Sequence, residues 1–142
     1  MKKILLILFS TLPIIASAQD IVVSTGVEKT VGGNQYGGSM MYETKKFWGA
    51  GPFCQAGVSK SGSENLLNDF FYGIALQAPI ARCEKISFVA IIRNGFVNEK
   101  YFAVVPSVET RIKLTPKAGV AIGTGLRSGY PSLSAKLFIR LF

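Results

Sequence analysis

Histidine is absent from this sequence, and cysteine occurs only twice among its 142 residues. Without histidine, the chain cannot build the Ser-His or Cys-His pairs that activate a nucleophile. Two cysteines alone cannot supply the four nitrogen or sulfur ligands of a structural zinc site. Acidic residues are also scarce, with 8 Asp and Glu against 16 Lys and Arg. These absences predict a protein that is not an enzyme, with no catalytic residue, metal site or cofactor.

Long apolar runs are lacking too, except for the stretch ILLILFSTLPIIA near the N-terminus. This stretch follows two lysines, is interrupted by Pro13 and ends at the small-x-small pattern of Ala16 and Ala18, as in a secretory signal peptide. It is short for a membrane-spanning helix, although a retained anchor is the alternative. The sequence therefore divides into a signal peptide at residues 1–19, cleaved after Ala18 or Gln19, and one mature domain at residues 20–142.

The mature chain is basic and exported. Residues 20–142 contain 14 Lys and Arg against 8 Asp and Glu, a formal charge of +6. This surplus suits anionic lipid phosphates, whereas export argues against nucleic acid, so we expect no nucleic-acid partner. One disulfide is conceivable in an oxidising compartment. We expect Cys54 in mid-strand and Cys83 in a turn to stay apart and free, because a bridge needs Cα atoms within about 7 Å.

Period-two alternation of apolar and polar residues runs through the mature chain, and no stretch has a sustained helical period. Within residues 101–114, for example, Val104 and Val108 share one face, whereas Glu109 and Arg111 share the other. Eight such runs are expected, near residues 20–31, 35–45, 48–60, 68–80, 85–97, 100–114, 117–127 and 132–142. The short connections between them predict sequential antiparallel neighbours. Eight twisted strands without a helix to cover their edges should close into an all-β, up-and-down barrel.

One face of these strands mixes glycine with charge. Gly119, Gly123 and Gly125 alternate along one run, and the same face of other runs carries acidic and basic side chains. Glycine weakens a solvated strand but suits a crowded interior. The other face is almost free of charge, and the runs are as long as the 9–11 tilted residues that cross a bilayer. The sequence therefore predicts a transmembrane barrel with its small and polar residues inside.

The mature chain resembles the small outer-membrane β-barrel proteins of Gram-negative bacteria, in particular those of Bacteroidetes. The resemblance rests on the signal ending SAQD, the eight alternating strands, the closing hairpin KAGVAIGTGLRSGYPSLSAKLFIRLF and the terminal Phe142. It implies an outer-membrane location, both termini in the periplasm, and Phe142 as an assembly signal read by the barrel-insertion machinery. Phe142 departs from the family pattern, because it shares a face with Lys136 and Arg140 rather than with the lipid-facing residues.

Charged residues on the inward face are candidates for ion pairs inside the barrel, because buried charge is tolerated only when it is paired. We expect a cross-seam pair between Glu28 and Lys136, since the last strand should adjoin the first. A carboxylate-based enzyme is the alternative, with a solvent-open cavity around Glu43 and Glu109. The lumenal ion-pair candidates are Glu28, Glu43, Arg93, Glu109, Arg111, Lys136 and Arg140.

These features together predict a monomeric, non-enzymatic outer-membrane barrel with a structural or surface-interaction role. Its lumen should be filled by side chains, because eight strands leave no room for an aqueous channel. Its expected partner is outer-membrane lipid, with lipopolysaccharide as a further candidate. Lys29, Lys60, Lys100 and Arg127 lie near the outward loops, where we expect solvated rim charges, and contact with lipopolysaccharide phosphates is the alternative. The alternative is a soluble, exported, lipocalin-like barrel that binds an apolar ligand and turns Phe70 and its apolar neighbours inward.

Overall fold

Eight β-strands account for nearly all of the residues that the computed structural model describes, which are 20–60, 66–127 and 129–141. The predicted signal peptide at residues 1–19 and the terminal Phe142 lie outside the described residues. The strand bounds agree with the sequence prediction to within a few residues. The strands are β1 (Asp20–Thr30), β2 (Gly33–Glu43), β3 (Gly49–Lys60), β4 (Leu66–Arg82), β5 (Ile86–Val97), β6 (Tyr101–Lys113), β7 (Ala118–Arg127) and β8 (Tyr130–Arg140).

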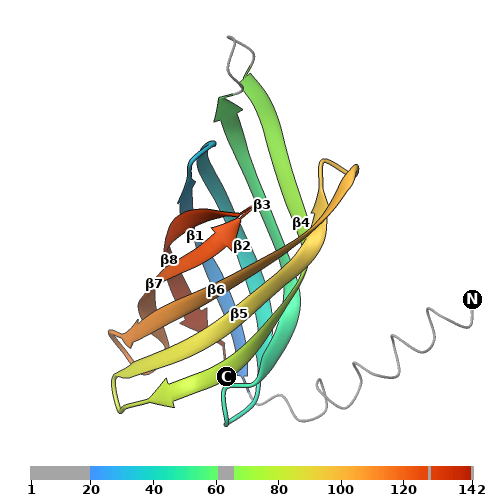
Figure 1. Cartoon of the computed structure of the whole chain (residues 1–142). Helices are drawn as coiled ribbons and strands as arrows, with labels where there is room; N and C mark the ends of the chain where they lie inside the picture. The colour runs from blue at the N-terminus through green and yellow to red at the C-terminus, as the bar shows by residue number, and fades with distance from the viewer. Residues whose placement is uncertain (1–19, 61–65, 128, 142) are drawn as a thin grey trace, which may run out of the picture.

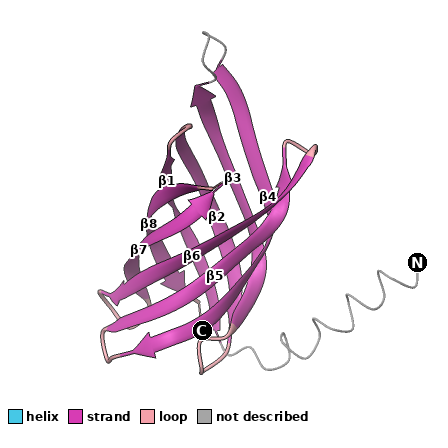
Figure 2. Ribbon diagram, in the orientation of Figure 1, coloured by secondary structure: helices cyan, strands magenta, loops and turns pink. Residues whose placement is uncertain are grey.

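The strands form one closed barrel in which each strand pairs with its sequence neighbours and β8 pairs antiparallel with β1. Figure 1 shows this meander, with the start of β1 and the end of β8 at the same end of the barrel. We call this end, with turns 44–48, 83–85 and 114–117, the terminus end, and the opposite end the loop end. Figure 2 shows strands and turns but no helix in the described part of the chain. The predicted all-antiparallel, eight-stranded barrel is confirmed.

The large apolar side chains point out of the barrel. Ile74 and Leu76 on β4 are 50% and 47% exposed, whereas their neighbours Ala75 and Gln77 face the interior and are 3% and 2% exposed. Phe70 also faces outward. The lipocalin-like alternative required this apolar face to line the interior, so the structure contradicts it. The interior, called the lumen below, holds the glycines and charges together with a smaller apolar core that includes Phe53, Phe71 and Phe138.

Backbone pairing between β6 and β7 stops short of the loop end. The last pair is Ser107 with Gly125, although β6 begins six residues earlier, at Tyr101. Pro106 is the next residue of β6, and proline has no N–H to donate to a neighbouring strand. Beyond this point the β5–β6 hairpin diverges from the β7–β8 hairpin, as Figure 1 shows. The barrel wall is therefore complete around the middle and separated between β6 and β7 at the loop end.

Glycine allows two strands to approach closely where Gly73 on β4 faces Gly95 on β5. A Cβ atom added to Gly73 would lie 2.0 Å from the carbonyl oxygen of Asn94 and 2.5 Å from the Cα of Gly95. Both atoms belong to the backbone and cannot rotate away. The inward glycines that weaken a strand by propensity are thus required here by space.

We predict that Gly73→Ala lowers the free energy of unfolding of the mature barrel by about 1–3 kcal/mol, because the added methyl group overpacks a backbone contact. Urea titration of protein refolded in detergent micelles measures this loss. Gly49→Ala is the matched control, because its added Cβ would meet its nearest atom, the Tyr42 oxygen, at 3.1 Å. Equal losses in the two variants would show that close approach is not the reason for Gly73.

Candidate functional site: the charged lumen

Arg93 on β5 joins three strands across the lumen near its middle. Its Nη1 donates to Glu28 Oε2 at 2.5 Å and its Nη2 to Glu28 Oε1 at 3.0 Å, so a fork-shaped pair spans from β5 to β1. Gln55 on β3 completes the group, because its Oε1 accepts from Arg93 at 2.9 Å and its Nε2 donates to Glu28 at 2.9 Å. All three side chains are buried.

A second group of the same composition lies closer to the terminus end. Arg111 on β6 donates from Nη1 to Glu43 Oε1 at 3.1 Å and from Nη2 to Gln77 Oε1 at 2.5 Å. Gln77 on β4 donates in turn to Glu43 on β2 at 2.6 Å. Arg140 adds a further bond to Glu43 Oε2 at 3.1 Å and pairs with Asp20 at 2.9 Å.

The barrel thus contains two Glu-Gln-Arg triads, one on β1, β3 and β5 and the other on β2, β4 and β6. Each triad uses every second strand because neighbouring strands are staggered in a barrel. The stagger places the inward residues of alternate strands in the same layer. In each triad the glutamine amide bridges acid and base, so the carboxylate and the guanidinium both gain a neutral partner. Paired and hydrogen-bonded in this way, buried charge is tolerated.

Glu109 on β6 connects the second triad to β8. It accepts a hydrogen bond from Lys136 Nζ, and its Oε2 lies 3.9 Å from Arg111 Nε. Arg127 at the loop end donates to Gln35, lies 4.0 Å from Asp69 and stacks 4.8 Å above the ring of Phe71. The charges therefore form a column along the lumen rather than isolated pairs.

All seven predicted ion-pair candidates point into the lumen and take part in ion pairs, but one predicted partnership is wrong. Glu28 does not pair with Lys136, because the seam register places Glu28 opposite Ser134 and Lys136 opposite Gly26. Glu28 on β1 instead reaches across the lumen to Arg93 on β5, and Lys136 on β8 passes over β7 to Glu109 on β6. The predicted pair joined directly neighbouring strands, whereas the partners of both charges lie on strands that are not neighbours.

Sequence reasoning missed Gln55 and Gln77, which bridge acid and base in the two triads. The sequence does contain a signal for both glutamines. In the alternating pattern of its strand, each one falls on the inward face, next to small residues. Sequence reasoning also missed Phe47, which the turn 44–48 folds into the terminus end of the lumen with a φ of 65°. A turn containing two lysines gave no indication of a buried ring.

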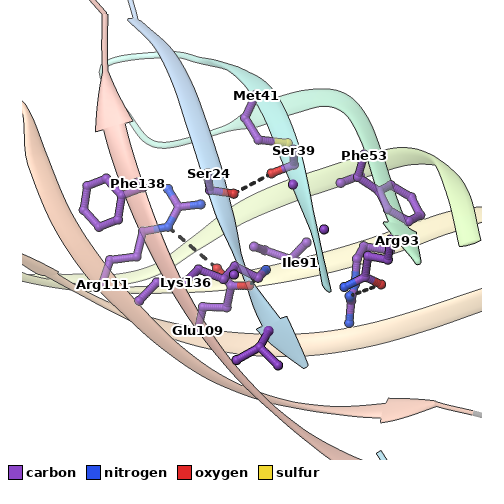
Figure 3. Close-up of a pocket in the computed structure, with 17 residues that line it drawn as sticks. Ser24, Ser39, Met41, Phe53, Ile91, Arg93, Glu109, Arg111, Lys136 and Phe138 are labelled. Atoms are coloured by element: carbon purple, nitrogen blue, oxygen red, sulfur yellow. Dashed lines mark hydrogen bonds and ion pairs between the residues drawn. The ribbon is translucent and has the colours of Figure 1, made fainter. Parts of the chain in front are cut away.

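Between the triads lies a cavity of about 30 Å³ (Figure 3). Ser24, Ser39, Glu109, Arg111 and Lys136 supply its polar lining, and the two serine hydroxyls are hydrogen-bonded at 2.8 Å. A cavity of this size holds about two water molecules, whereas small-molecule sites measure roughly 300–1,000 Å³. The carboxylate-enzyme alternative required a solvent-open cavity, but Glu43 and Glu109 are 0% and 2% exposed and bonded to cations.

Other features of a ligand site are not found in the described residues. Cys54 on the outer face of β3 and Cys83 in the 83–85 turn are both exposed and free. The part of the chain that the structure describes contains no group of three or more His, Cys, Asp or Glu side chains suited to a metal ion. It also contains no helix long and apolar enough to cross a membrane.

Comparison with known proteins gives fold similarity only. No family model matches the chain, and no curated protein matches it. A solved structure titled "De novo design of transmembrane beta-barrels" is 10% identical, with a TM-score of 0.61, covering 87% of this chain and 97% of that one. The solution NMR structure of the de novo designed TMB2.3 is 17% identical, with a TM-score of 0.53, covering 87% of this chain and 96% of that one. The chain therefore has the fold of small transmembrane β-barrels, and its resemblance to a bacterial family stays a prediction.

We predict that Arg93→Met lowers the free energy of unfolding by about 3–5 kcal/mol, because it leaves the Glu28 carboxylate buried without its cation. Adding Glu28→Gln to this variant removes the unpaired buried charge and should restore part of the lost unfolding free energy. Urea titration of the two single variants and the double variant in the same micelles gives the coupling energy. Additive losses would contradict direct pairing of the two side chains.

Proposed function

We propose that the mature chain is a small integral outer-membrane β-barrel of a Gram-negative bacterium, without enzymatic activity, that has a structural or surface-interaction role. The observation that carries the proposal is the combination of an apolar outer wall with a charged lumen. A water-soluble barrel would gain nothing from exposing this wall, whereas lipid requires it. Similarity to designed transmembrane barrels supports the same conclusion.

The outer wall has the layered composition of a membrane-spanning surface. Its middle carries exposed aliphatic side chains such as Ile74 and Ile122. Exposed aromatic residues lie toward both ends, with Trp48 at the terminus end and Tyr101 and Tyr130 at the loop end. Trp and Tyr favour the two membrane–water interfaces, where an amphipathic ring meets both lipid and water. The aromatic residues therefore indicate where the two interfaces lie on the barrel.

The lumen supports a role other than transport. Its charges are bonded to one another, and the cavity between the triads is about 30 Å³. The loop end offers only short described turns, such as 31–32 and 98–100. We therefore assign no channel and no substrate to the protein. Any interaction with other molecules takes place on its outer surface. We propose that the protein is a monomer and has no nucleic-acid partner.

At the loop end, fewer basic residues are available for lipopolysaccharide contact than the sequence alone indicated. Lys29 and Lys100 are exposed there and available to phosphate groups. Arg127 is not available, because its guanidinium turns into the lumen, where it donates to Gln35 and covers Phe71. The side chain of Lys60 lies outside what the structure describes. Residues 1–19 and Phe142 also lie outside the described residues, and we propose them as a cleaved signal peptide and as the assembly signal.

Fractionation of cells that express the full chain tests the proposal. We expect the protein to sediment with outer membranes and to migrate differently on SDS gels before and after boiling, because a closed barrel resists SDS until it is heated. Recovery as a soluble periplasmic protein in the absence of detergent would overturn the proposal.

A pair of arginine substitutions tests which face meets lipid and at what depth. We predict that Ile74→Arg, in the middle of β4, lowers the unfolding free energy in phospholipid vesicles by about 2–4 kcal/mol. Ile80→Arg, near the terminus end of the same strand, should cost about 0–1 kcal/mol, because it reaches the interface. Both residues are outward and similarly exposed, at 50% and 58%. Equal effects of the two substitutions would contradict a bilayer centred on the middle of β4.

A further inference from the structure

Basic residues are concentrated at the terminus end of the barrel. The turns and strand ends there carry seven basic residues against three acidic ones, whereas the loop end carries four basic residues against Asp69 and Glu99 among the described residues. Half of the 14 basic residues of the mature chain therefore lie at this end. The seven basic residues are Lys45, Lys46, Arg82, Lys85, Lys113, Lys117 and Arg140.

The acidic residues of this end leave most of that charge without a partner. Glu43 is buried and bonded to Arg111 and Arg140, and Asp20 pairs with Arg140. Glu84 is the one exposed acidic residue among the turns of this end. Five basic side chains are exposed there and make no ion pair within the described part of the chain. These five, called the basic collar below, are Lys45, Lys46, Arg82, Lys85 and Lys117.

Phe47 gathers cations at the terminus end of the lumen, next to the collar. Its ring is 4% exposed and has three cations around it, with Arg82 Cζ at 4.7 Å, Arg140 Cζ at 4.9 Å and Lys113 Nζ at 5.8 Å from the ring centroid. The ring attracts these cations through its quadrupole but does not neutralise them. Gln77 donates to the Phe47 carbonyl at 2.9 Å and Arg82 to the Lys45 carbonyl at 3.4 Å. Phe47 thus anchors one collar residue, Arg82, beside two further cations of this end, Arg140 and Lys113.

The collar also borders the apolar outer wall. Trp48 lies in the same turn as Lys45 and Lys46 and is 57% exposed, and Ile80 and Leu114 are exposed next to Arg82 and the 114–117 turn. Long basic side chains beside an apolar band extend to the headgroup level, where their alkyl stems cover apolar surface and their charges meet phosphate. A lipid headgroup phosphate therefore fits the collar better than a soluble polyanion does, because only the lipid also contacts the neighbouring apolar wall.

We propose that the basic collar binds the phosphate groups of anionic phospholipids in the membrane leaflet at the terminus end. This inference rests on the proposed membrane barrel and adds a lipid-binding site to it, at the end opposite the candidate lipopolysaccharide contacts. A basic side chain near an anionic membrane surface contributes about a fivefold gain in association, and the gain falls as salt screens the charges. Anionic lipid at this end would offset its surplus of positive charge.

The single tryptophan of the chain gives a local readout, because Trp48 lies within the collar. The refolded mature protein is placed in phosphatidylcholine vesicles that contain a minor fraction of brominated phosphatidylglycerol or, in parallel, of brominated phosphatidylcholine. Bromine quenches tryptophan fluorescence on contact, so the ratio of quenching measures lipid preference next to Trp48. We expect stronger quenching by the anionic lipid, and we expect added salt to reduce the difference.

Two matched variants distinguish lipid binding at the collar from the effect of the overall positive charge of the protein. Replacing Lys45, Lys46, Lys85 and Lys117 with Gln should abolish the preference for the anionic lipid, whereas Lys29→Gln with Lys100→Gln at the loop end should preserve it. Inorganic phosphate, added at constant ionic strength, should not displace the lipid, because the collar also uses the neighbouring apolar wall. Displacement by phosphate would overturn the assignment to a headgroup.

Two results would overturn the inference in different ways. Equal quenching of the wild type by both lipids, with the heat-dependent gel shift intact, would remove the lipid site and leave the membrane barrel standing. An absence of quenching by either lipid would show that the barrel does not enter the bilayer, and both proposals would then fail together.

Discussion

The hydrogen-bonded seam between β1 and β8 is the constraint on which the rest of this structure depends. It joins Val22 to Arg140 and continues to Lys29 and Leu133, so the first and last strands have no free edge along this length. A closed sheet leaves few backbone groups unpaired, which is the condition for exposing an apolar wall to lipid. Closure also forces every inward side chain into one narrow lumen, and the charge chemistry of the protein follows from that confinement.

Confinement explains why the lumen contains networks rather than isolated pairs. Glu28 and Arg93 cannot reach bulk water, so each must find complementary groups within the barrel. Gln55 and Gln77 add hydrogen bonds to the acid and the base of each triad, and glycines such as Gly37 and Gly123 provide the space that the side chains of Gln55 and Glu109 require. The Glu-Gln-Arg arrangement recurs because adjacent layers of the barrel face the same physical problem. The result is an interior bonded to itself, with little room for a ligand.

The two ends of the barrel differ in how their charged and aromatic side chains are arranged. At the loop end Arg127 turns inward, and β6 separates from β7 at Pro106. At the terminus end Phe47 closes the lumen and the basic collar faces outward around it. If anionic lipid occupies the collar, the protein has a preferred interaction with one leaflet as well as a preferred orientation. A role at the membrane surface is then compatible with a closed lumen.

The sequence by itself determined the number of strands, their order and which face of each meets the outside, because alternation with period two survives in any register. It also placed Glu28, Glu43, Arg93 and Arg111 inside, since the parity of a strand residue decides its face. Only the tertiary structure decided which charges meet, as the failure of the Glu28–Lys136 pair shows. Partners are chosen across the lumen by the stagger of the strands, and stagger is a property of the closed sheet rather than of any single strand. The inward turn of Phe47 likewise depends on a segment far away in the chain, because Gln77 donates to the Phe47 carbonyl.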